Sequence, residues 1–152
     1  NTVNYFYNTH VSYLDDPTLY SSPDYWASPL ETFARGRGDC EDYAIAKYFT
    51  LIQAGMSQDK LRLVYVKATL GNAVVGHMVL AYYQSLDSEP VILDNLISDI
   101  KLASERPDLK PVYSFNAAGL WQGISNSGAG DPMIRISKWR DAIEKTHEEG
   151  FN

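Results

Sequence analysis

The pattern of apolar and polar positions predicts one well-defined helix in the first third of the chain. Apolar residues recur at intervals of three and four between Ile45 and Ile52, which is the spacing of a helix face that packs on a core. Asp39 can cap the start of this helix, and Asp42, three residues later, can partly complete a capping box. Gly55 is placed to end it. The sequence therefore predicts a helix from Asp39 to just before Gly55.

Strands are expected downstream, because β-branched and aromatic residues concentrate in short runs there. The runs cover residues 61–68, 77–83, 91–94 and 112–115. Residues 107–111 indicate a turn, 123–132 a loop and 137–148 a terminal helix, whereas 96–102 is ambiguous. One helix followed by an antiparallel sheet predicts an α+β fold.

The N-terminal segment gives a weaker pattern. Residues 1–29 are rich in Tyr, Asn, Ser, Asp and Pro and are expected to be irregular, with a short strand at 3–7. Ser28 followed by Pro29 resembles a helix start, with Ser28 as the cap and Glu31 in the first turn. A short helix is expected from this point.

Composition narrows the class of protein. With 152 residues, 45% of them hydrophobic and 21% charged, the chain is expected to form a single domain over residues 1–152. The most apolar stretch, 74–83, is too short to span a bilayer, so no direct membrane insertion is expected. The net charge of −6 argues against a nucleic acid as partner.

Cys40 is the only cysteine of the chain, and it lies in the run 36–42, GRGDCED. A lone cysteine forms no internal disulfide, which leaves packing, metal binding or catalysis. Its place at the start of the predicted helix favours catalysis, because the helix dipole and the unpaired backbone N–H groups stabilise a thiolate there.

A cysteine nucleophile needs an imidazole as base and a third group that orients the imidazole. Of the three histidines, His10 lies in the irregular segment and His147 in a charged tail, whereas His77 opens an apolar strand. If this strand and the next form a hairpin closed by the polar loop 84–89, Asp94 lies directly across from His77. His77 and Asp94 are therefore the candidates for these two roles.

The acidic residues beside the thiol have two interpretations. Asp39, Glu41 and Asp42 place three negative charges around Cys40, which raises the pKa of a thiol. A hard cation held by these carboxylates would reverse that effect. The spacing is not that of an EF-hand, and the same acids could simply cap the helix.

Four short sequence motifs, called family words below, carry a family resemblance. They are 26–31 (WASPLE), 36–44 (GRGDCEDYA), 76–80 (GHMVL) and 93–95 (LDN). Over residues 20–140 the chain resembles the bacterial transglutaminase-like cysteine proteinases. The resemblance implies a papain-like or transglutaminase-like core, with the nucleophile at the N-terminus of a core helix packed on an antiparallel sheet. It implies Cys40 as nucleophile, His77 as base and Asp94 as the group that orients it.

The resemblance also implies a biological setting. Such enzymes are calcium-dependent periplasmic endopeptidases that cut the N-terminal region of a large cell-surface adhesin at a di-alanine site, which releases cells from biofilms. An inner-membrane receptor for cyclic di-GMP can sequester them. For this chain, calcium is expected at Asp39, Glu41 and Asp42.

Two other functions stay open from the residues alone. The same three groups could transfer an acyl group to an amine, as transglutaminases do. The chain could also be a non-catalytic, calcium-stabilised module that binds a receptor, its triad being vestigial.

Overall fold

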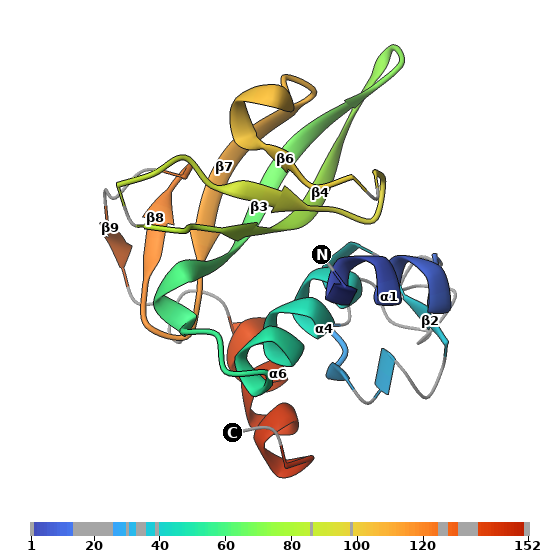
Figure 1. Ribbon diagram of the computed structural model, residues 1–152, viewed down its shortest axis with the longest axis vertical. Coiled ribbons are helices and arrows are strands. Elements are labelled where there is room, and N and C mark those ends of the chain that lie inside the picture. The colour runs from blue at the N-terminus through green and yellow to red at the C-terminus, as the bar shows by residue number, and fades with distance from the viewer. Residues whose placement is uncertain are drawn as a thin grey trace.

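The chain folds into an antiparallel sheet with helices packed against one side, as Figure 1 shows. This computed structural model describes residues 2–13, 26–29, 31–32, 36–38, 40–85, 87–97, 99–124, 128–130 and 137–150. The helices are α1 (Thr2–His10), α4 (Cys40–Gln53) and α6 (Ser137–Glu148), with short 3-10 turns η1 (Gln58–Lys60) and η2 (Ala103–Glu105). The predicted α+β class is confirmed.

Among the described residues, seven strands form the sheet, in the order β6-β5-β4-β3-β7-β8-β9, and all neighbours are antiparallel. Their bounds are β3 (Leu61–Leu70), β4 (Ala73–Tyr82), β5 (Val91–Leu93), β6 (Lys101–Leu102), β7 (Leu109–Phe115), β8 (Leu120–Gln122) and β9 (Gly128–Gly130). A separate parallel pair joins β1 (Ser12–Tyr13) to β2 (Arg37–Gly38). The long β3–β4 hairpin forms the centre of the sheet.

The predicted helix is α4, and it supplies the core on one face of the sheet. Ile45 and Tyr48 are fully buried and pack in one cluster with Leu63 of β3 and Leu80 of β4. The helix ends at Gln53, and Gly55 follows with a φ of 103°. A positive φ at this point is what a glycine after a helix provides.

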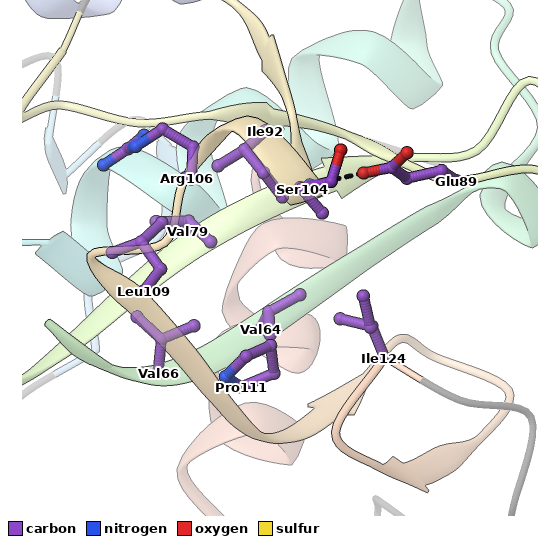
Figure 2. A pocket seen from close by; sticks show the side chains of 11 residues that line it. Val64, Val66, Val79, Glu89, Ile92, Ser104, Arg106, Leu109, Pro111 and Ile124 are labelled. Atoms are coloured by element: carbon purple, nitrogen blue, oxygen red, sulfur yellow. Dashed lines mark hydrogen bonds between the residues drawn. The ribbon is translucent and has the colours of Figure 1, made fainter.

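Alternate residues of the same strands build a second apolar cluster on the other face. Val64 and Val66 of β3 pack there with Val79 of β4 and Ile92 of β5. A pocket of about 280 Å³ opens beside them, with Arg106 on its wall (Figure 2). The central strands are therefore apolar on both faces, in keeping with their nearly continuous hydrophobic sequence.

The expectation of a strand at 3–7 was wrong, because these residues belong to helix α1. Tyr7 and Val11 are buried against Tyr43 and Ala46 of α4, with Val3 at the edge of the same cluster. Apolar residues four positions apart lie on one side of a helix. Residues 14–25 of the predicted irregular segment lie outside the described residues.

The expected turn at 107–111 was also partly wrong, because β7 begins at Leu109. Pro111 is tolerated within this strand since the pairing with β3 shifts there: Tyr65 faces Tyr113, but Val66 faces Pro111. A residue without an N–H group fits a strand best at such a bulge.

The short helix start at Ser28 is confirmed. Its backbone N–H donates to Glu31 Oε1 at 3.0 Å, and its hydroxyl oxygen accepts from the Glu31 backbone at 3.3 Å. This reciprocal pair is a capping box. No helix of the described chain combines the length and the apolar character needed to cross a bilayer.

The terminal helix is an integral part of the core, which gives a first prediction. Trp139 of α6 is 0% exposed, its ring contacts Tyr48, Phe49 and Phe115, and its Nε1 donates to Asn116 O at 3.1 Å. We expect Trp139→Ala to lower the free energy of unfolding by about 3–5 kcal/mol. Urea unfolding followed by circular dichroism measures this, with exposed Lys138→Ala as the control. A loss as small as that of the control would contradict the assignment of α6 to the core.

Candidate active site

Cys40 is the first residue of α4, where the sequence predicts the nucleophile. Its side chain is half-buried, and as the only cysteine of the chain it is in no internal disulfide. The N–H groups of a first helical turn have no partner within the helix, and the dipole is positive there, so both favour a thiolate. The core contacts of α4 hold this thiol in a fixed place.

Strand β2 passes close to the start of α4, which explains a glycine of the cysteine-centred word. A Cβ atom at Gly38 would lie 2.8 Å from the Cβ of Asp42, closer than real Cβ contacts allow. Asp42 is buried, and its Oδ1 accepts a hydrogen bond from the Ala27 N–H at 3.0 Å. Asp42 therefore ties the Trp26–Ala27 segment to the first turn of α4.

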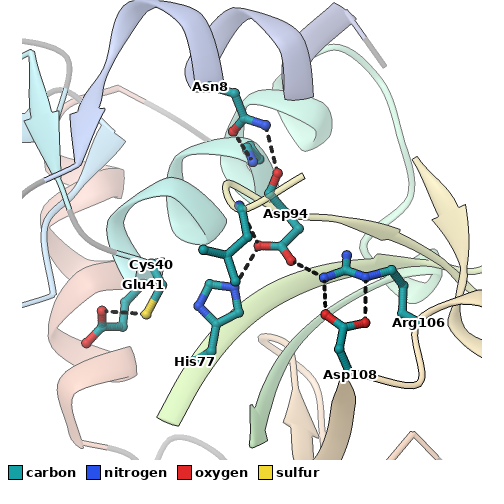
Figure 3. A network of polar contacts seen from close by, with 9 residues as sticks. Asn8, Cys40, Glu41, His77, Asp94, Arg106 and Asp108 are labelled. Carbon is teal, nitrogen blue, oxygen red and sulfur yellow. Dashed lines mark hydrogen bonds and ion pairs between the residues drawn. The ribbon is translucent and has the colours of Figure 1, made fainter. Parts of the chain in front are cut away.

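His77 of β4 and Asp94, which follows β5, form the polar pair that the sequence predicts. His77 Nε2 lies 2.6 Å from Asp94 Oδ1, and the aspartate side chain is 0% exposed. The Leu96 N–H donates to the same oxygen at 3.0 Å. Figure 3 shows the imidazole with this carboxylate behind it.

The two strands reach this pairing in another register than the one expected. Leu80 pairs with Leu93 and Tyr82 with Val91. This register is shifted by two residues from the one in which His77 would lie directly opposite Asp94. Side chains alternate with period two, and a shift of two keeps both groups on the same face. Diagonal neighbours remain within reach of long side chains, which is why the hydrogen bond forms.

The protonation of the pair follows from the surroundings of Asp94. Burial raises the pKa of this carboxyl, but hydrogen bonds from His77, Leu96 and Arg106 outweigh it, and the pKa lies below its ordinary value. An ionised Asp94 accepts, so His77 Nε2 carries a proton and donates it. Nδ1 is then the nitrogen that can accept a proton from another group.

Cys40 and His77 line one pocket of about 350 Å³, together with Trp26, Glu41, Tyr65, Gly76, Met78 and Tyr113. The Tyr65 and Tyr113 rings stack at 5.4 Å. A Cβ at Gly76 would lie 2.5 Å from the Tyr65 hydroxyl oxygen, so this tyrosine can occupy its place only beside a glycine. The pocket thus combines a thiol, an imidazole and an aromatic wall.

A further layer of polar groups holds Asp94 from behind (Figure 3). Arg106 NH2 donates to Asp94 Oδ2 at 2.8 Å and also binds Asp108. On the other side, Asn8 of α1 donates to the backbone oxygen of Asp94 at 2.7 Å, and Lys47 of α4 donates to Asn8 Oδ1 at 2.8 Å. The segment after η2 and helix α1 therefore both bind Asp94, and α4 supports this arrangement through Asn8.

Sequence reasoning missed this layer. Lys47 lies two residues from both Ile45 and Phe49, on the opposite side of the predicted helix from its apolar stripe, where a charge is expected to be exposed. Asn8 was hidden by the wrong assignment of α1. Arg106 and Asp108 lie in a short polar segment with no periodic pattern, and nothing local marks them.

Of the predicted metal ligands, Glu41 lines the pocket and Asp42 does not. Glu41 faces the pocket, and its Oε2 lies 3.2 Å from Cys40 Sγ. Asp42 is buried and binds Ala27, and Asp39 lies outside the described residues. Within the described ranges, no three His, Cys, Asp or Glu side chains form a metal-binding group. Carboxylate oxygens nevertheless have the chemistry that calcium prefers.

Comparison with known proteins assigns the family. Residues 1–127 match the family of the bacterial transglutaminase-like cysteine proteinases (BTLCP). The chain belongs to this family. No curated protein matches this cysteine proteinase.

Structures of LapG from Legionella pneumophila are similar to this proteinase. The EGTA-treated form is 48% identical with a TM-score of 0.83, over 95% of this chain and 76% of that chain. The calcium-bound form is 46% identical with a TM-score of 0.79, over 95% and 76% of the two chains. The expected transglutaminase-like fold is confirmed.

Lys47 makes the stability of the proteinase depend on pH. It is 1% exposed, and burial lowers its pKa to about 7, against the raising effect of Asp94. Above pH 7 the unfolded chain, with an ordinary lysine pKa, binds more protons than the folded protein, so stability rises with pH. Relative to Lys47→Met, we expect the parent to gain about 1.4 kcal/mol between pH 6 and pH 8.

Urea unfolding of both proteins at each pH measures this difference. The other titrating groups are common to both and cancel. Exposed Lys67→Met on β3 is the matched control and should show no such trend. A difference that stays constant or falls with pH would contradict the burial of a lysine with a lowered pKa.

Proposed function

We propose that this chain is a calcium-dependent cysteine endopeptidase with Cys40 as nucleophile, His77 as base and Asp94 as the group that orients the imidazole. The observation that supports this most is the pocket shared by Cys40 and His77, with Asp94 hydrogen-bonded to the far side of the ring. Membership in a family of cysteine proteinases supports the same assignment.

The chemistry follows from the free nitrogen of the imidazole. His77 Nδ1 takes the proton of the Cys40 thiol, and the thiolate attacks the peptide carbonyl carbon. The tetrahedral intermediate collapses, the C–N bond breaks, and the leaving amine takes the proton from Nδ1. Water then attacks the acyl-enzyme with His77 again as base, which frees the acid and restores the thiol.

Negative charge on the carbonyl oxygen needs donors in the pocket. The Cys40 backbone N–H is one proposed donor, because it belongs to the first turn of α4, beside the thiol that attacks the carbonyl. The second is expected near Trp26, which lines the same pocket.

For the biological role, we propose a large cell-surface adhesin as substrate, cut in its N-terminal region at a di-alanine site in the periplasm. Release of cells from a biofilm would follow, and an inner-membrane cyclic di-GMP receptor would inhibit the enzyme by sequestering it. The support is the family resemblance of the sequence words. Incubation with a di-alanine adhesin fragment, with and without calcium, followed by sequencing of the products, tests it.

The proposed triad gives a graded prediction in that assay. We expect Cys40→Ala to abolish cleavage and Asp94→Asn to lower kcat about 10⁴-fold, since the amide stabilises the wrong imidazole tautomer. His77→Ala should lose as much cleavage activity as Cys40→Ala. His147 is an exposed histidine of α6, and His147→Ala should cleave as fast as the parent. Cleavage that survives Cys40→Ala would end the proposal. A primary amine in the reaction tests acyl transfer, which would give an amide product in place of the acid.

Calcium would act on the electrostatics of the thiol. The Glu41 carboxylate lies 3.2 Å from Cys40 Sγ, and a negative charge at that distance opposes a thiolate. We propose that Asp39, Glu41 and Asp42 hold the ion, and its charge then offsets theirs. Support comes from the similarity to LapG, which is known in a calcium-bound form.

We expect EGTA to abolish cleavage and added calcium to restore it. Glu41→Gln should weaken calcium binding about tenfold or more by isothermal titration calorimetry, because it removes a charged ligand. Glu144→Gln, on the exposed side of α6, is the matched control. Equal affinity of the two variants would remove Glu41 from the ligand set.

A further inference from the structure

The two oxygens of the Asp94 carboxylate are held in different ways. Oδ1 accepts from His77 Nε2 at 2.6 Å and from the Leu96 N–H at 3.0 Å. Oδ2 accepts from Arg106 NH2 at 2.8 Å, and no other donor to it occurs among the described residues. Because the carboxylate is buried, water does not replace a missing donor at Oδ2.

Arg106 is itself fixed on several sides. Its side chain is 2% exposed, its Nε donates to Asp108 Oδ1 at 3.1 Å, and its NH2 donates to Asp108 Oδ2 at 2.9 Å. Its backbone N–H and C=O pair with Ala103 and Leu109. Its stem forms part of the wall of the pocket on the outer sheet face, seen in Figure 2. The guanidinium therefore has little freedom to leave Asp94.

These contacts determine what happens to Asp94 without Arg106. A buried carboxylate with one oxygen unpaired is unfavourable, and it lowers its free energy by rotating or by taking up a proton. Either change weakens the hydrogen bond from His77 Nε2. The Nδ1–H tautomer, in which the ring has no free base toward Cys40, then becomes populated.

We propose that Arg106 is a positioning residue of the active site: it holds the Asp94 carboxylate in the orientation and charge state that keep His77 in its Nε2–H tautomer. The proposal rests on the triad proposed above. It adds a fourth residue that touches neither substrate nor thiol and acts through Asp94.

An arginine suits this place for a geometric reason. Asp94 and Asp108 are bound by the same guanidinium, and Asp108 takes two of its N–H groups in a bidentate pair. A lysine ammonium keeps the charge but has no planar fork with which to serve both carboxylates. The kcat of Arg106→Lys is therefore expected to lie between those of the parent and of Arg106→Gln.

The chain offers a matched control in Arg62 of β3. It is also 2% exposed, and its guanidinium packs on Trp121 at 3.8 Å from the ring centre. Val66 is the residue of β3 that pairs with His77, and Arg62 lies four residues before it on the same strand. The two backbone positions are therefore about 13 Å apart. Loss of Arg62 removes a buried arginine from the sheet without touching Asp94.

The experiment compares the Lys and Gln variants of Arg106 with those of Arg62, all as the full chain with calcium. In ¹⁵N-histidine NMR spectra, we expect the Nε2–H tautomer of His77 in the parent and both Arg62 variants, and a tautomer mixture in Arg106→Gln. With the di-alanine fragment, Arg106→Gln should lose about 10- to 100-fold in kcat with KM within about twofold.

Each outcome decides the matter. The order parent, Arg106→Lys, Arg106→Gln in kcat, with the Arg62 variants near the parent, supports the proposal. A His77 spectrum and kcat in Arg106→Gln equal to those in Arg62→Gln would overturn it. If Arg106→Gln does not fold, Arg106→Lys and Asp108→Asn replace it in the same test. Asp108 is suited to this because its side chain is 33% exposed, so its substitution disturbs the core less. If the parent cuts nothing, the proposed function fails, and the NMR spectra still decide the role of Arg106.

Discussion

A charged carboxylate buried at Asp94 is the constraint that the rest of the site depends on. It is kept ionised because three donors converge on it: His77 from β4 and Arg106 from the segment after η2, which are distant in sequence, and the neighbouring Leu96 N–H. Asn8 of α1 fixes its backbone. Pairing of β4 with β5 and placement of the segment after η2 are therefore needed to orient the carboxylate toward the imidazole.

Local signals in the sequence were sufficient for the parts of the fold that rely on local physics. The spacing from Ile45 to Ile52 and the glycine at 55 predicted α4, and the runs of β-branched residues predicted β3, β4 and β5. The pair His77 and Asp94 could be found because the start of one strand and the end of the next share an edge of the sheet. Even a two-residue error in register left them on one face.

The remaining features depend on tertiary contacts, which leave weak marks on the sequence. Helix α1 is stabilised by packing of Tyr7 and Val11 on α4, and its polar composition concealed the spacing of four. Lys47 is held in the core by Asn8, a partner 39 residues away, and by the charge of Asp94. Arg106 comes from a segment without periodicity, so its importance appears only when the sheet brings it to Asp94.

The family words also contain residues whose role is steric. Gly38 lets β2 pass the first turn of α4, and Gly76 leaves room for the Tyr65 hydroxyl beside His77. Neither glycine can take part in proton transfer, yet a Cβ at either point would move the element that carries Cys40 or the wall of its pocket. These family words therefore contain most of the residues that line the pocket and the glycines that let the backbone come close to it. Arg106 and Asn8 bind Asp94 on the side away from the pocket, and they lie outside the family words.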